Sequence, residues 1–187
     1  EQGRMRKVDE PEITQAELTS MALDCANWGA KSFAELSLLT PPPATHEQVA
    51  WGLLQQLELI DSQRKLTPLG RDAYALGCHP RLAHMLLKAK QLAQDDNQPQ
   101  LCLLACVLAG IIEARGLPKK GADIHHYLTE ALQGQIKQQV RQWQQSLAIS
   151  GQINEAIRNA STRDISYLLA LAYPDRIAKA RVMKAFY

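Results

Sequence analysis

A run of twelve residues, LCLLACVLAGII at positions 101–112, restricts the possible fold of this chain more than any other feature. A helix that is apolar around its whole circumference must be covered on every side. The run is too short for the roughly 20 residues that a membrane span needs. It therefore predicts a buried central helix surrounded by other helices.

The remaining sequence also predicts a mainly α fold. Apolar residues at helical spacing recur across the chain, most clearly at Ile136, Val140, Trp143 and Leu147. Further helices are expected in the segments 14–28, 32–35, 45–57, 80–92, 124–132 and 165–172. The motifs TQAE (14–17) and THEQ (45–48) match the capping box that starts a helix.

A small β-element is expected between the third predicted helix and the fourth. Residues 59–60 and 65–66 can pair as two very short strands around the polar turn 61–64. Thr67 followed by Pro68 is a strong helix start, because proline at the first helical position loses no hydrogen bond. Three helices, a minimal two-stranded wing and a following helix form the order of a winged helix.

The stretch ALGCHPRLAH places Cys78 beside His79, a pair that could begin a metal site or mark a nucleophile. A zinc site needs four converging ligands, and no such set follows from the spacing, so no metal site is predicted. Gly77 is expected to end one helix and Pro80 to start the next. The residue before a proline is extended, so Gly77, Cys78, His79 and Pro80 are predicted to form a joint between two domains.

The helix that begins at Pro80 suggests a nucleic-acid contact. Arg81, His84 and Lys88 lie at helical spacing on the face opposite its leucines. Such a ridge of hydrogen-bonding and basic groups can follow a single strand. The alternative is an ordinary solvated face. Arg141, on the polar side of a later helix, is a weaker candidate of the same kind.

Charge is distributed unevenly along the chain. Residues 137–187 contain eight Lys and Arg against three acidic residues, whereas the first 136 residues have a formal charge of −3. A basic C-terminal third suits contact with phosphates, but it equally suits a solvated surface beside another domain.

The first residues lack the apolar segment of a signal peptide. We therefore expect a cytoplasmic protein without a membrane segment, read from the middle of a longer chain.

A nucleotide site is not expected. The segment GLPKKGAD (116–123) has the glycine spacing of a phosphate loop, but Ala122 and Asp123 stand where that loop needs Lys and Ser or Thr.

The stretch from 38 to 87, LLTPPPATHEQVAWGLLQQLELIDSQRKLTPLGRDAYALGCHPRLAHMLL, resembles the winged-helix and helicase-associated (ratchet) region of DEAH-type helicases. The tail AYPDRIAKAR is similar to one bacterial group of ATP-dependent RNA helicases within that family. The resemblance covers residues 8–181. The chain departs from the family at LGCHP, where Gly77 and Cys78 replace a small apolar pair.

The resemblance implies a linker and winged helix at 1–77, a helical ratchet bundle at 78–160 and a helical tail at 161–187 that leads into a further domain. It implies an accessory, noncatalytic region that packs on the RecA-like motor domains of the same chain. Single-stranded RNA or DNA would be the other partner. ATP and Mg²⁺ would bind the motor, so the fragment should be inactive alone. A winged-helix transcription regulator and a scaffold without nucleic-acid contact are the alternatives.

Overall fold

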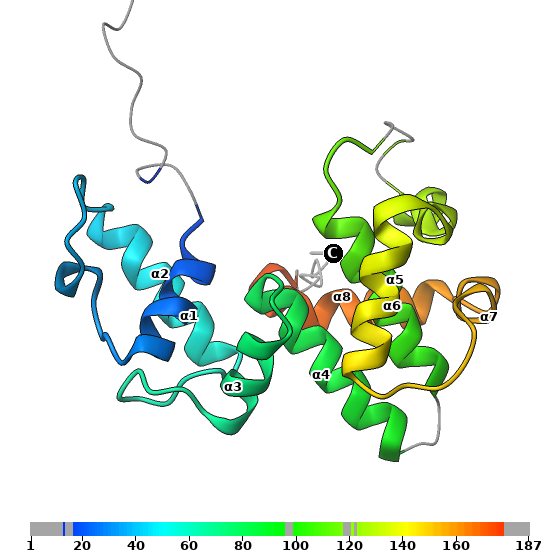
Figure 1. The fold of residues 1–187 in the computed structure, drawn as a ribbon, viewed down its shortest axis with the longest axis horizontal. Coiled ribbons are helices and arrows are strands. Elements are labelled where there is room, and N and C mark those ends of the chain that lie inside the picture. The colour runs from blue at the N-terminus through cyan, green and yellow to red at the C-terminus, as the bar shows by residue number, and fades with distance from the viewer. Residues whose placement is uncertain (1–12, 14–16, 96–98, 118–120, 122, 178–187) are drawn as a thin grey trace, which may run out of the picture. The chain divides into compact units, whose positions relative to one another are not determined.

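The computed structural model describes residues 13, 17–95, 99–117, 121 and 123–177 (Figure 1). The chain divides into two compact units, residues 1–83 and 84–187. The division falls inside helix α4 (Pro80–Asp95). Every named element in the described ranges is helical, which confirms the mainly α fold class. The assignment of the units as winged helix, ratchet bundle and tail stays a prediction.

The first unit contains α1 (Thr19–Trp28), the short 3₁₀-helix η2 (Phe33–Glu35), α2 (Ala44–Gln56) and α3 (Pro68–Ala75). Helix α1 packs against both α2 and α3. The buried side chains of this unit come from all of these elements, including Leu23, Phe33, Leu54 and Ala73.

Helix α1 ends where the sequence predicts. Gly29 follows its last residue with a φ of 87°, a left-handed conformation that glycine adopts without strain. Thr14, the expected cap at the start, lies outside the described residues. Glu17 takes part in the start instead, since its carboxylate accepts the N–H of Thr19 at 3.1 Å and the hydroxyl of the same residue.

The predicted capping box at residues 45–48 is wrong. Helix α2 begins at Ala44, directly after Pro43, and has no side-chain cap. The carboxylate of Glu47 instead accepts the backbone N–H of Phe33 at 2.9 Å and the indole N–H of Trp51 at 3.1 Å. Glu47 therefore holds the segment before α2 against the helix.

The predicted two-stranded wing is a single antiparallel bridge between Ile60 and Leu66 in the described part of the chain. The reason lies in the turn. One carboxylate oxygen of Asp61 accepts the N–H groups of Gln63 at 2.8 Å and Lys65 at 2.9 Å. A backbone N–H bound to a side chain in this way is lost to a strand ladder.

The start of α3 is confirmed. The hydroxyl oxygen of Thr67 accepts the N–H of Gly70 at 3.0 Å, and Pro68 is the first helical residue. The same hydroxyl donates to the carbonyl of Glu58 at 2.6 Å. Thr67 thus joins the helix start to the chain segment that precedes the bridge.

The second unit is built around α5 (Pro99–Glu113), as the apolar run predicts. Residues 102–111 of this helix are all buried. Helix α5 contacts η3 (Ile124–Leu132), α6 (Gly134–Ser146), α7 (Ile153–Arg158) and α8 (Thr162–Ala172). The thiols of Cys102 and Cys106 belong to this core.

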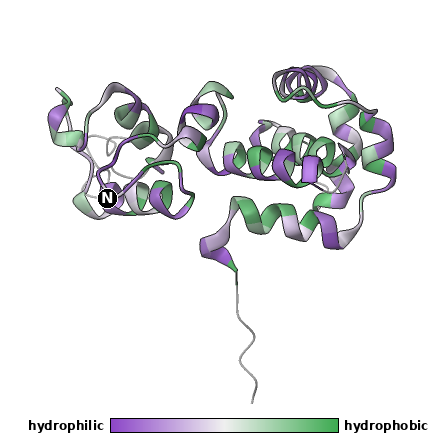
Figure 2. Ribbon diagram, turned by 90° about the horizontal axis from the view of Figure 1, so that it is seen from below, coloured by the Kyte–Doolittle hydropathy of each residue, from purple (hydrophilic) through white to green (hydrophobic). Residues whose placement is uncertain are grey.

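The helices around α5 combine buried and exposed residues. Figure 2 shows hydrophobic and hydrophilic residues alternating along the ribbon. Val140, Trp143 and Leu147 of the predicted stripe are buried. The segment 124–132 is a 3₁₀-helix whose cap is Asp123, which accepts the N–H of His125 at 2.9 Å. The tail contains α8 and the 3₁₀ turn η4 (Pro174–Arg176). Across the described residues, each helix is too short or too polar to cross a lipid bilayer.

Candidate nucleic-acid interface

The four residues Gly77, Cys78, His79 and Pro80 connect α3 to α4. Gly77 has a φ of 64°, and its N–H bonds the carbonyl of Tyr74 at 3.2 Å. Helix α4 then starts at Pro80. The connection between two helices is confirmed, and its role as a joint between domains stays a prediction.

His79 caps the new helix and fixes its start to α1. Its Nδ1 accepts the N–H of Arg81 at 3.3 Å, so its Nε2 donates to the carboxylate of Glu17 at 2.7 Å. Burial raises the pKa of Glu17. The hydrogen bond and charge of His79, the N–H of Thr19 and the charge of Arg81 lower it by more, and the pKa lies below its usual value. The histidine of the connection is therefore engaged within the fold.

The first half of α4 is buried on all sides. Residues 80–86 are all buried, including Arg81 at 7% exposure and His84 at 8%. The alternative of an ordinary solvated face does not fit these two buried side chains, and the expected nucleic-acid contact through Arg81, His84 and Lys88 stays a prediction. Lys88 is half-buried.

His84 has a structural role in the second unit. Its Nδ1 lies 2.8 Å from the carbonyl oxygen of Leu171. A carbonyl can only accept, so Nδ1 carries the proton in this contact. Leu171 lies in the last turn of α8, where carbonyls have no partner inside their own helix. His84 thus satisfies one end of α8 and ties it to α4.

Replacing this histidine is expected to destabilise the second unit. His84→Ala removes the donor to the Leu171 carbonyl together with a buried imidazole, which should lower the free energy of unfolding by about 2 kcal/mol. His84→Asn keeps a donor near the position of Nδ1 and should lose less than half as much. Urea denaturation followed by circular dichroism measures both. Equal losses in the two variants would show that the hydrogen bond contributes little.

Arg141 differs from the residues of α4 because it is exposed. It lies on α6, whose sequence GQIKQQVRQWQQS contains two basic residues, six glutamines and no acidic residue. Apart from Gln135 in the first turn, the exposed side chains between its ends are Gln138, Arg141, Gln142 and Gln145, here called the α6 outer face. Lys137 is half-buried beside it. The absence of carboxylates from a polar helix was the sequence signal that the spacing argument missed.

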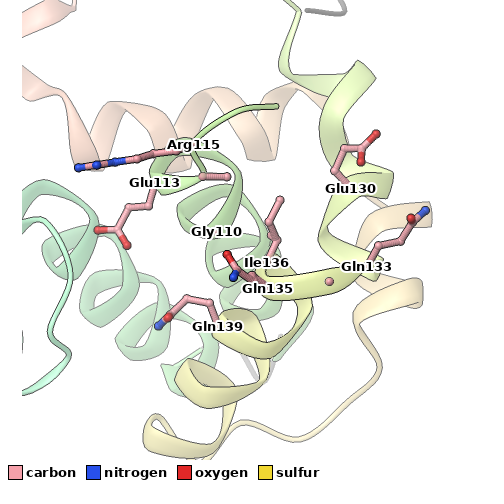
Figure 3. A pocket seen from close by; sticks show the side chains of 10 residues that line it. Gly110, Glu113, Arg115, Glu130, Gln133, Gln135, Ile136 and Gln139 are labelled. Carbon is pink, nitrogen blue, oxygen red and sulfur yellow. The ribbon is translucent and has the colours of Figure 1, made fainter. Parts of the chain in front are cut away.

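A pocket of about 620 Å³ opens at the start of α6. Its lining comes from the end of α5, the end of η3 and the first turns of α6. In Figure 3 Glu113, Arg115 and Gln139 lie on one side of it, and Glu130 and Gln133 on the other. The remaining lining residues are Gly110, Ala114, Gly134, Gln135 and Ile136. Half of its six polar side chains are therefore amides, which both donate and accept hydrogen bonds.

Comparison with known proteins shows which proteins this chain is similar to. No family model matches the chain. The chain is 33% identical over 173 residues to the ATP-dependent RNA helicase HrpB of Escherichia coli strain K12. The chain resembles one region of HrpB. The match covers 92% of this chain and 19% of that protein, so the chain spans about a fifth of the length of its relative.

Two crystal structures agree with this likeness. The E. coli DExH-box NTPase HrpB matches with a TM-score of 0.74 at 30% identity, over 95% of this chain and 20% of that one. The structure described as E. coli DEAH/RHA helicase HrpB gives a TM-score of 0.74 at 29% identity, over 96% and 21%. The resemblance to DEAH-type helicases, and to the HrpB group within them, is confirmed.

Proposed function

We propose that the chain is a noncatalytic accessory region of an ATP-dependent RNA helicase. The support is its likeness to HrpB over nearly all of its own length and a fifth of the relative's. The remaining part of such a protein would contain the RecA-like motor domains, bind ATP and Mg²⁺, and pack against this region. In this proposal residues 1–77 are the winged helix and residues 78–160 the ratchet bundle of a cytoplasmic enzyme.

Within that role, the α6 outer face contacts the backbone of single-stranded nucleic acid. The observation that carries this step is an exposed helix face made of Arg141 and glutamines, without any carboxylate on the helix. Cations attract phosphates and amides hydrogen-bond them, whereas a carboxylate would repel them. Lys137 adds a second positive charge one turn before Arg141. We therefore assign the proposed nucleic-acid contact to α6 rather than to α4, where Arg81 and His84 are buried.

The chain is expected to bind single-stranded RNA weakly and with a clear salt dependence, because few phosphates are contacted. Fluorescence anisotropy of a labelled oligoribonucleotide, measured from 25 to about 200 mM salt, tests this. Binding that weakens steadily with salt supports the proposal. No binding at the lowest salt would contradict a nucleic-acid contact by this region and favour a pure scaffold.

The same assay separates this role from that of a winged-helix transcription regulator. Such a regulator inserts a recognition helix into the major groove of duplex DNA. Helix α2, the third helix expected from the sequence, has no Lys or Arg, and its Glu47 already holds Phe33 and Trp51. We therefore expect single-stranded RNA to compete better than duplex DNA of equal length. Preferential competition by the duplex would favour the regulator.

A further inference from the structure

We propose that the pocket at the start of α6 takes one unpaired base of the bound strand. The inference rests on the proposed single-strand contact and adds a base site to it. Its volume of about 620 Å³ lies within the range of small-molecule pockets in proteins. The pocket and the α6 outer face share one helix, so a strand that contacts one can reach the other.

The charge of the pocket favours a base over a phosphate. Glu113 and Glu130 bring two negative charges and Arg115 one positive charge to the lining. The lining side chains thus provide no excess of positive charge to attract a phosphate. A neutral base needs no such charge, and Gly110, Ala114 and Ile136 provide apolar surface for its flat face.

The hydrogen-bonding groups suit the edge of a base. Gln133, Gln135 and Gln139 line the pocket, and none of their amides has a hydrogen-bond partner in the described part of the chain. The edge of every base presents donors and acceptors side by side, and unpaired bases are commonly recognised through those edges. An amide offers the same pair of groups, so these three side chains can bind a base without strict selection among the four.

On α6, the residues proposed to contact the base lie on a different side of the helix from those proposed to contact the phosphates. Gln135 and Gln139 are one turn apart and face the pocket. Lys137 and Arg141 are also one turn apart, but they follow by two residues and so lie about 200° further around the helix. The α6 outer face has Arg141 at one edge and extends from there toward the side of Gln135 and Gln139. A strand crossing it would place phosphates toward Lys137 and Arg141 and a base toward the pocket.

The test compares an oligoribonucleotide with an abasic strand that has the same number of phosphates. We expect the unaltered chain to bind the strand with bases about tenfold more tightly, because two or three amide hydrogen bonds to one base edge add up to a factor of that order. The double variant Gln135→Ala and Gln139→Ala removes two of these amides and should reduce that ratio to about two. Its salt dependence should not change, because both amides are neutral.

The matched control removes two exposed amides outside the pocket, Gln94→Ala and Gln152→Ala, and should keep the tenfold ratio. Thermal denaturation shows that each variant is folded. An equal affinity of the unaltered chain for both strands, or a ratio that survives in the pocket variant, overturns the base site and leaves the backbone contact standing. Absence of any RNA binding overturns the base site and the proposed function together.

Discussion

Gly70→Ala is expected to destabilise the first unit by about 3 kcal/mol or more, although it adds a single methyl group. A Cβ atom at this position would lie 1.9 Å from the carbonyl oxygen of Leu59 and 2.9 Å from its carbon. Both are backbone atoms, so no side-chain rotation relieves the clash. The same carbonyl accepts the N–H of Thr67 at 3.0 Å, and a shift would also disturb the start of α3.

Gly52→Ala is the matched control within the same unit. Gly52 lies inside α2, and a Cβ atom there has no neighbour within 4 Å. Alanine has a higher helix propensity than glycine, so the free energy of unfolding of this variant should rise by up to about 1 kcal/mol. Thermal denaturation of both variants gives the comparison. A loss at Gly52 as large as at Gly70 would contradict the close approach of α3 to Leu59 as the cause.

Leu108→Ala is expected to lower the free energy of unfolding of the second unit by about 3–5 kcal/mol. Leu108 is fully buried in the central helix α5. Shortening it leaves a cavity that the surrounding helices fill only in part. For a chain of this size, the melting temperature should fall by about 10 °C.

Leu39→Ala provides the control, because Leu39 is fully exposed in the segment between η2 and α2. This variant should change the free energy of unfolding by no more than about 0.5 kcal/mol. Calorimetry of the two variants tests whether α5 is the core element. Similar melting temperatures for both would show that α5 does not hold the unit together.

The elements that the sequence predicts correctly depend on local signals. The apolar run at 101–112 needs cover on every side whichever helices supply it, and α5 is buried as expected. Gly29 ends α1 and Thr67 starts α3, each through contacts with residues a few positions away. Such contacts can be read from spacing because they do not depend on the rest of the fold.

The features that the sequence does not predict depend on partners far along the chain. His84 is expected from its spacing to lie on a nucleic-acid-contacting ridge, but its Nδ1 lies against the carbonyl of Leu171, 87 residues away. Thr45 and Gln48 match a capping box, but α2 starts at Ala44, and Glu47 between them holds Phe33 from another segment. The expected wing is reduced to one bridge because Asp61 captures the N–H of Lys65.

The candidate interface also depends on contacts between residues that are far apart in the sequence. The spacing of Arg81, His84 and Lys88 predicts a shared face, and burial removes two of them from solvent. The exposure of Arg141 depends on which side of α6 packs against α5, and Trp143 and Val140 on that helix determine that side. The pocket could not be predicted, because its lining comes from three elements that meet only in the folded unit.

The central claim is that α6 supplies the contact with the strand, and the salt dependence of RNA binding tests it most directly. The double variant Lys137→Ala and Arg141→Ala should weaken binding at low salt and reduce the slope of log affinity against log salt by about 1.4, or 0.7 for each lost phosphate contact. The control Arg158→Ala and Arg163→Ala removes two exposed charges from α7 and α8 and should keep the slope of the unaltered chain. An unchanged slope in the α6 variant, or an equal loss in the control, would contradict the account.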